Sequence, residues 1–335
     1  MGKNHVALAV TGVTAASIGF LVALYVQKKA ANDEDKKWAV PEEFIGSPYE
    51  KEVRLAMKWA KIAGTKMTKQ LDTKATSAET DDLGILTKGK DIDFATVIDL
   101  ENEELITKGI QENFPDHQII GEESTESFGT GVVAPMQKDT RTWIIDPVDG
   151  TTNFASAIPL CCVSIGMCDA GVPVMGVVYA PATGEVYLGI KGKGAYRNGE
   201  RISLKKAQDE KRPLSNSIVC FEFGYARSED AIKKMLGAVE RIMRNGCRTT
   251  RSLGSGVLDL CYVATGRLDV VYTGLADEGW KPWDFCAGMV FVQEAGGVIE
   301  DLWQEGTFDL YKRDMICAVS QDLLNETRKV VIGKK

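Results

Sequence analysis

Residues 143–154 of the chain read WIIDPVDGTTNF, and this stretch is the most informative one for fold and chemistry. Its first three residues, 143–145, are apolar and predict the end of a buried strand. The strand leads Asp146 and Asp149 into a turn that a proline stiffens and that Gly150 allows to bend sharply. Because two like charges held this close repel each other, the arrangement usually needs a cation between them. The motif therefore predicts a metal site.

The composition is that of an ordinary globular protein. The 335 residues are enough for a large core and favour about two domains. Hydrophobic residues make up 44% and charged residues 26% of the chain. The net charge of −7 gives no basic surface for nucleic acid. A negatively charged protein that handles phosphates would need metal ions to offset its own field, which agrees with the motif.

Cysteine and histidine usage narrows the chemistry further. Most of the eight cysteines lie inside apolar runs and no C-x-x-C pair occurs, so we expect buried, reduced thiols and a reducing compartment. The only histidines are His5 and His117. Zinc sites and histidine-dependent nucleophiles are therefore poorly supported, because both normally use imidazole.

The N-terminal residues form a separate unit. Val6–Val26 is a run of 21 uncharged residues, about 31 Å long as a helix, which is enough to span a bilayer. We expect a transmembrane anchor in residues 1–27 and a polar linker over residues 28–46. More lysines follow the span than precede it, which places the main domain on the cytoplasmic side. The alternatives are a cleaved signal peptide and a core helix of a soluble cytoplasmic protein.

The remaining residues, 47–335, alternate between helical and strand patterns and predict an α/β domain, with two lobes of about residues 47–210 and 211–335. Asn198-Gly199 is a hairpin signal. Helices are expected at about 48–71, 99–114 and 228–244 and from 255 and 284, and strands at 118–120, 142–145, 160–167, 172–179, 185–190 and near 270 and 316.

Four short segments carry acidic or polar groups at expected strand ends and helix starts, where backbone amides favour anions such as phosphate. Their carboxylates have no histidine or cysteine companions, and an all-oxygen set of this kind suits Mg²⁺ or Mn²⁺. Taken singly, each residue also has an ordinary explanation as a helix cap or a solvated loop residue. Their joint presence favours a site. The segments are Lys88–Asp99, Gly121–Ser124, Asp146–Thr151 and Trp283–Asp284.

The order of these motifs resembles that of the inositol monophosphatase family of metal-dependent, lithium-sensitive phosphatases. GEES at 121–124 precedes the central motif, and WDFCAG at 283–288 and EAGG at 294–297 follow it. The likeness runs from about residue 48 to the C-terminus. DGTTNF, without a lysine after DGT, favours the inositol phosphatase branch over the bisphosphate nucleotidases. The resemblance implies a layered αβαβα sandwich of the sugar-phosphatase type, here preceded by the N-terminal hydrophobic helix.

The resemblance also implies a Mg²⁺ site of two or three ions. Glu122, Asp146 and the backbone carbonyl of Val148 would bind one ion. Asp146, Asp149 and Asp284 would bind a second. A weaker third ion would be held at Glu122 through waters.

Further roles follow from the same resemblance. Thr151, paired with Asp99, would position and polarise the attacking water, and Glu122 would take part through its metal. Lys88 corresponds to a mobile-loop lysine near the metals, and Glu123 would help to shape the acidic loop. The implied substrate contacts are Asp149, Gly150, Thr151, Gly254, Ser255, Gly256 and Asp277. Because residues 273–282 are longer than in many relatives, Glu278 is the alternative to Asp277.

The resulting hypothesis is hydrolysis of a phosphate monoester, myo-inositol monophosphate first, by metal-activated water. No covalent phosphoenzyme is needed. A haloacid-dehalogenase-type site would need carboxylates two residues apart, whereas these are three apart. The alternatives are a phosphatase for a bisphosphate nucleotide or a sugar phosphate, a membrane-anchored pseudoenzyme that serves as a binding module, and a structural calcium site, although the EF-hand pattern is absent. Relatives are commonly dimers, so a homodimer is expected.

Overall fold

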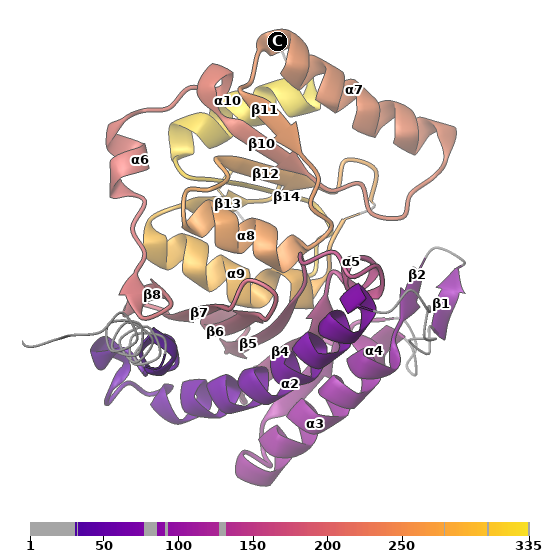
Figure 1. Cartoon of the computed structure of the whole chain (residues 1–335). Helices are drawn as coiled ribbons and strands as arrows, with labels where there is room; N and C mark the ends of the chain where they lie inside the picture. The colour runs from indigo at the N-terminus through magenta and orange to yellow at the C-terminus, as the bar shows by residue number, and fades with distance from the viewer. Residues whose placement is uncertain are drawn as a thin grey trace, which may run out of the picture.

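The computed structural model describes residues 31, 33–76, 86–90, 93–126, 132–277, 279–306 and 308–333. These residues form an α/β fold built on two mixed β-sheets with helices between and outside them (Figure 1). The membrane span expected at Val6–Val26 lies outside the described residues. Among those that are described, no helix has the length and apolar character needed to cross a bilayer.

The first sheet has seven strands that lie in the order of the sequence, β3-β4-β5-β6-β7-β8-β9. Strands β3 and β4 are parallel, and every later pair is antiparallel. The turn at Asn198-Gly199 joins β8 to β9 with φ of 51° and 75°, which confirms the expected hairpin. The strands are β3 Gln118–Gly121, β4 Thr142–Asp149, β5 Cys162–Asp169, β6 Val172–Ala180, β7 Glu185–Ile190, β8 Gly194–Arg197 and β9 Glu200–Arg201.

The second sheet has five strands in the order β11-β10-β12-β14-β13. Strand β10 is parallel to both neighbours, and β14 is antiparallel to both of its own. A separate antiparallel pair, β1 and β2, was not expected from the sequence. The strands are β1 Leu86–Lys90, β2 Asp93–Ala95, β10 Ile218–Phe221, β11 Thr249–Arg251, β12 Val270–Thr273, β13 Val298–Glu300 and β14 Met315–Ala318.

The helices complete five layers. Helices α2 and α3 cover the outer face of the seven-stranded sheet, α8 and α9 lie between the sheets, and α7 and α10 lie beyond the five-stranded sheet (Figure 1). This layered α/β arrangement confirms the expected fold class. The helices are α2 Glu50–Thr76, α3 Val97–Asn113, α4 Glu122–Glu126, α5 Thr151–Ala155, α6 Lys205–Asp209, α7 Glu229–Asn245, α8 Gly256–Ala264, α9 Pro282–Ala295 and α10 Gln321–Ile332, with 3₁₀ turns η1 Glu42–Phe44 and η2 Leu214–Asn216.

Helix α9 joins the two halves of the core. It is buried on nearly all sides, as expected for a helix held between two sheets. Its close approach to the seven-stranded sheet depends on glycine, because a Cβ atom at Gly176 would lie 2.7 Å from the carbonyl oxygen of Ala287. All eight cysteines are free thiols, and all except Cys247 are buried, as the sequence indicated.

The segment expected to be a polar linker differs from the prediction where it is described. Residues 33–37 are helical, and Phe44 is fully buried. The ring of Trp38 packs edge-on against Tyr179, with 5.0 Å between ring centroids. The charged composition of the segment concealed these aromatic anchors, whose burial outweighs the polar character of their neighbours.

Candidate active site

Strand β4 carries the acidic motif into the site. Pairing with β5 continues to Asp149, with a register shift between Asp146 and Asp149. The expectation that the strand ends at residue 145 and that both aspartates lie in a turn was therefore wrong. A bulge absorbs the proline and re-aims the side chains within the strand. The reversal comes at Gly150, with φ of 82°, where a Cβ atom would lie 2.8 Å from the Leu160 carbonyl oxygen.

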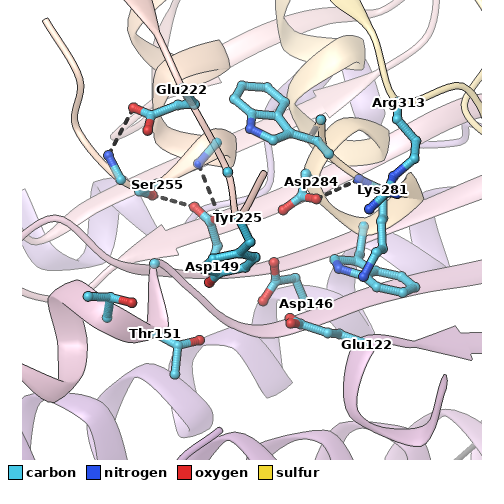
Figure 2. Close-up of a pocket in the computed structure, with 18 of the residues that line it drawn as sticks. Glu122, Asp146, Asp149, Thr151, Glu222, Tyr225, Ser255, Lys281, Asp284 and Arg313 are labelled. Carbon is cyan, nitrogen blue, oxygen red and sulfur yellow. Dashed lines mark hydrogen bonds between the residues drawn. The ribbon is translucent and has the colours of Figure 1, made fainter. Parts of the chain in front are cut away.

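Four carboxyl groups come together at the C-terminal end of β4, and two of them belong to this strand. Oxygen atoms of Asp146, Asp149 and Asp284 lie within 4.8 Å of one another, and Glu122 lies beside Asp146 (Figure 2). Their positions depend on three elements, since Glu122 begins α4 and Asp284 lies in the first turn of α9. We call these four residues the acidic cage.

The electrostatics of the acidic cage favour a bound cation. Burial, reinforced by Glu122 and the other aspartates, raises the pKa of Asp146 well above its usual range. Burial also raises the pKa of Asp149 to about 6 and, with the charges of Asp149 and Glu122, that of Asp284 to about 8. Negative charge is thus crowded into a desolvated volume. The all-oxygen donor set has the chemistry that Mg²⁺ prefers.

The N-terminus of α8 fixes Asp149. The Asp149 carboxylate accepts hydrogen bonds from the backbone amides of Gly256 and Val257, both at 3.1 Å, and from the Ser255 hydroxyl. The helix dipole favours a negative group at this end. The contact also ties residues 254–256 to the acidic cage.

Asp284 combines a structural role with its place in the cage. One carboxylate oxygen accepts a hydrogen bond from the backbone amide of Lys281 at 2.7 Å and so caps the start of α9. The Lys281 side chain forms an ion pair with Glu126. The two explanations considered for Asp284, a helix cap and a site residue, therefore both hold geometrically.

The expected pair Thr151 and Asp99 is in contact. Thr151 Oγ1 lies 3.1 Å from Asp99 Oδ1 and 3.0 Å from the Val148 carbonyl oxygen. Asp99 is fully buried and also accepts a hydrogen bond from the Thr96 backbone amide at 3.0 Å, so it caps α3 as well. Because the Thr151 hydroxyl has one proton, it donates to one of its two neighbours and keeps lone pairs for a further donor.

A cavity of about 530 Å³ joins these groups. The acidic cage and residues 150–153, 224–226 and 254–256 line it, and Ser255 and Tyr225 lie close to Asp149 (Figure 2). Asp277 is also among the residues that line it. Of the expected site residues, those that line the cavity are Glu122, Asp146, Val148, Asp149, Gly150, Thr151, Gly254, Ser255, Gly256, Asp277 and Asp284.

The remaining expected residues are placed differently. Asp99 and Glu123 are buried and are not among the residues that line the cavity, although Asp99 contacts Thr151, which does line it. The side chain of Lys88 and the whole of Glu278 lie outside what the structure describes. The choice between Asp277 and Glu278 thus stays a prediction.

Sequence reasoning missed several contributors. Glu103 accepts hydrogen bonds from the backbone amides of Glu123 and Ser124, both at 2.7 Å, and so holds the first turn of α4, where Glu122 lies. Its own segment, LENEELI, looks like an ordinary helix surface. The cavity-lining residues that were missed include Glu126, Glu222, Tyr225, Lys281 and Arg313, none of which belongs to a local motif.

Comparisons with known proteins show the family to which the chain belongs. The chain matches the sequence model of the inositol monophosphatase family over residues 49–332. It is 32% identical over 250 residues to human inositol monophosphatase 1, covering 75% of this chain and 86% of the relative. It is 39% identical over 217 residues to inositol monophosphatase 1 of Solanum lycopersicum, covering 65% and 75%.

A solved structure provides the matching fold. The extragenic suppressor protein suhB of Bartonella henselae superimposes with a TM-score of 0.70 at 26% sequence identity, covering 84% of this chain and 98% of that one. Together with the family match and the curated relatives, this likeness establishes that the chain belongs to the inositol monophosphatase family and is a phosphatase.

Proposed function

We propose that the enzyme hydrolyses a small phosphate monoester with Mg²⁺, and that myo-inositol monophosphate is its preferred substrate. The observation that carries the proposal is the convergence of four carboxyl groups from β4, α4 and α9 beside the Thr151–Asp99 pair. A cavity of about 530 Å³ suits a small phosphorylated polyol, and its acidic part suits metal-assisted chemistry.

The proposed metal ligands are those that the family resemblance implies, and the closeness of the carboxyl groups in the acidic cage supports them. Glu122, Asp146 and the Val148 carbonyl would hold one ion, and Asp146, Asp149 and Asp284 a second. A third ion would be held at Glu122 through waters. Bound Mg²⁺ supplies a more acidic water and offsets the charge that develops on the leaving oxygen.

The chain's own groups then orient the reactants. Asp99 accepts a hydrogen bond from the Thr151 hydroxyl, which leaves Thr151 Oγ1 to accept a hydrogen bond from the attacking water. The backbone amides of Gly150 and Thr151 are the proposed phosphate contacts. Residues 254–256 and Asp277 are the proposed contacts of the alcohol part, because they line the cavity beside the acidic cage.

The test is phosphate release from inositol 1-phosphate, adenosine 3′,5′-bisphosphate and a hexose phosphate, each with and without Mg²⁺ and lithium. We expect Mg²⁺-dependent turnover that is fastest on inositol 1-phosphate and is inhibited by lithium. If either of the other two substrates were hydrolysed faster, the proposed substrate would be wrong, but the proposed Mg²⁺-dependent hydrolysis would stand. If folded, Mg²⁺-loaded protein released no phosphate from any of them, the binding-module alternative would take its place.

A further inference from the structure

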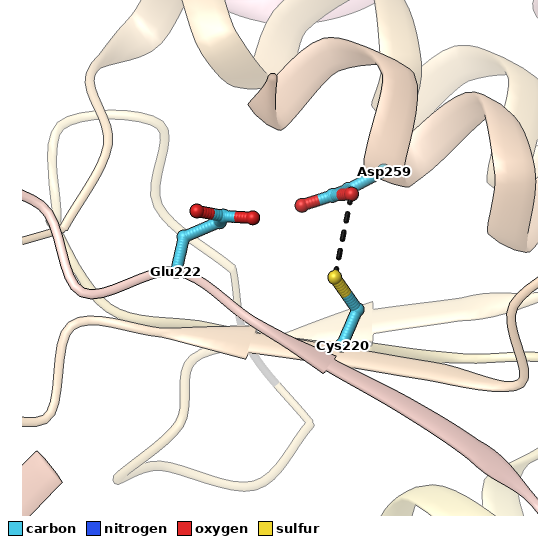
Figure 3. Close-up of side chains that lie close together, drawn as sticks. All are labelled: Cys220, Glu222 and Asp259. Carbon is cyan, nitrogen blue, oxygen red and sulfur yellow. Dashed lines mark hydrogen bonds between the residues drawn. The ribbon is translucent and has the colours of Figure 1, made fainter. Parts of the chain in front are cut away.

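A second cluster of ligand-type side chains lies at the wall of the cavity, with two of its three members buried. Ligand-type atoms of Cys220, Glu222 and Asp259 lie within 4.8 Å of one another (Figure 3). Cys220 belongs to β10, Glu222 directly follows that strand, and Asp259 belongs to α8. Sequence analysis assigned these residues no role, and the proposed chemistry does not use them.

Glu222 faces the cavity and anchors one of its loops. Its carboxylate accepts hydrogen bonds from the backbone amides of Leu253 at 2.6 Å and Gly254 at 2.9 Å, and from the Ser252 hydroxyl at 3.3 Å. The same loop continues directly into the start of α8, whose amides hold Asp149. Glu222 therefore holds residues 252–254 together with Asn153, whose Nδ2 donates to the carbonyl oxygens of Leu253 and Gly254; of this loop, Gly254 lines the cavity.

Asp259 lies on the inner side of Glu222 and is fully buried. Its Oδ1 atom accepts a hydrogen bond from the Cys220 thiol at 3.4 Å. Its Oδ2 atom receives no hydrogen bond from any donor in the described part of the chain. Within that part, no lysine or arginine forms an ion pair with Asp259 or Glu222.

With no lysine or arginine paired to either carboxyl group in the described part of the chain, the close approach of the buried Asp259 to the half-buried Glu222 disfavours ionisation of both groups at neutral pH. Burial is the main cause that raises the pKa of both Asp259 and Glu222. The negative charge of Glu222 raises the pKa of Asp259 further, whereas a hydrogen bond with Asp259 lowers the pKa of Glu222. The other titratable groups that act on Asp259 are Cys220 and the negative Asp149, which also disfavours its ionisation. Glu222 has three donors that stabilise its charge, whereas Asp259 Oδ2 has none, so the proton belongs on Asp259.

We infer that Asp259 is a positioning residue: protonated at Oδ2, it donates a hydrogen bond to Glu222 and thereby holds the loop at residues 252–254 in place for the substrate. The effect on catalysis rests on the proposed function. The effect on the loop does not.

Asp259→Asn and Asp259→Leu form a matched pair of variants. Asparagine keeps a donor toward Glu222 and an acceptor for Cys220, whereas leucine has a similar size and neither group. With Mg²⁺ and inositol 1-phosphate, we expect Asp259→Leu to raise KM about tenfold with a smaller change in kcat. We expect Asp259→Asn to stay within about twofold of the parent protein. Equal loss in both variants, or no loss in Asp259→Leu, would refute the inference.

The pH dependence of KM gives a readout that a purely structural role would not move. In the parent protein, loss of the Asp259 proton at alkaline pH leaves Asp259 and Glu222 both negatively charged and facing each other. KM should therefore rise at alkaline pH. Asp259→Asn has no proton to lose at this position, so its KM should stay flat over the same range. Both proteins contain the acidic cage, so the effect of pH on the cage is the same in both and cancels in the comparison. If KM changed identically with alkaline pH in the two proteins, a proton on Asp259 would be contradicted. This experiment does not need the Asp259→Leu variant.

Hydrogen exchange separates this inference from the proposed function, because it needs no turnover. The amides of Leu253 and Gly254 should lose protection in Asp259→Leu and keep it in Asp259→Asn. If inositol 1-phosphate were not hydrolysed but this difference appeared, the substrate proposal would fail and the positioning role would stand. Unchanged protection in both variants would remove the positioning role.

Discussion

At the residue scale, the chemistry centres on Asp146. It is 2% exposed, and burial together with the charges of Glu122, Asp149 and Asp284 raises its pKa well above the usual range. A carboxylate is retained in such a place only if it is protonated or if a cation offsets the repulsion. In the proposed enzyme, Asp146 would bridge two metal ions, and its removal should affect both.

We therefore expect Asp146→Asn to lower kcat/KM more than about a hundredfold, because several kcal/mol of charge stabilisation at the metals is lost. In metal-free buffer its melting temperature should equal or exceed that of the parent protein, because one buried charge is gone. Phosphate release and thermal unfolding with chelator measure the two effects. Asp116→Asn, at an exposed carboxyl group, is the control and should change neither. Full activity in Asp146→Asn would exclude the acidic cage as the metal site.

The raised pKa values predict how pH acts on the metal-free protein. Carboxyl groups titrate near 4 in the unfolded chain, whereas the pKa values of Asp149 and Asp284 are about 6 and about 8 in the fold. Between these limits the folded state binds more protons than the unfolded state, so metal-free stability should fall as pH rises from about 4 to 8. Mg²⁺ should therefore raise the melting temperature more at pH 8 than at pH 5. Melting curves with Mg²⁺ or chelator test this, and a pH-independent difference would contradict it.

Sequence analysis identified the acidic residues of the cage because they lie in short motifs that match a family. It did not find Glu103, Glu222 or Asp259. Glu103 acts on amides about twenty residues further along the chain, and Glu222 acts on amides about thirty residues further along. A single carboxylate at such a separation has no local pattern that distinguishes it from a surface residue.

At the scale of elements, the short helix α4 depends on a neighbour for its position. The first amides of a helix have no partner within the helix itself, and Glu103 of α3 accepts hydrogen bonds from two of those in α4. Glu122 begins this helix, so the acidic cage depends on a contact between α3 and α4 that involves no metal ligand side chain.

Glu103→Gln should weaken this support, because an amide side chain replaces one of the two acceptor oxygens with a donor and removes the charge. We expect the Mg²⁺ concentration for half-maximal activity to rise about fivefold, which corresponds to a loss of about 1 kcal/mol. A Mg²⁺ titration of phosphate release measures it. Glu104→Gln, one residue along the same helix, is the control. An unchanged Mg²⁺ requirement in Glu103→Gln would show that α4 needs no such support.

Element boundaries show where local reasoning fails. A proline between two aspartates is typical of a turn, yet β4 continues through Asp149 because β5 offers partners and a bulge absorbs the proline. Hairpin Asn198-Gly199 was predictable because its turn chemistry is local. The residue at which a strand ends depends on the neighbouring strand, which lies elsewhere in the sequence.

At the scale of the whole molecule, α9 connects the two sheets. The composition and periodicity of the chain predicted only a mixed α/β domain, and the five-layer order came from the family resemblance. Periodicity reports which face of an element is buried but not what covers it. For α9, apolar on nearly every side, even the face is undefined until both sheets are present.

Gly176→Ala should destabilise the fold by about 1–3 kcal/mol, because its Cβ atom would press on the backbone of α9 at Ala287. Chemical denaturation measures the loss. The same variant should need more Mg²⁺, because Asp284 lies in the first turn of the displaced helix. Gly237→Ala, in the amphipathic helix α7, should be neutral or stabilising. Equal stability of the two variants would mean that α9 can shift without cost.

The position of Asp284 at the start of α9 has a consequence for protein synthesis. Glu122, Asp146 and Asp149 leave the ribosome long before Asp284 does, and helix α9 has no complete packing surface until the strands on both of its sides exist. A nascent or truncated chain therefore presents only part of the proposed ligand set. Divalent ions would be captured, and phosphate esters cleaved, only once translation has delivered α9 and the strands β13 and β14 that follow it and complete the second sheet.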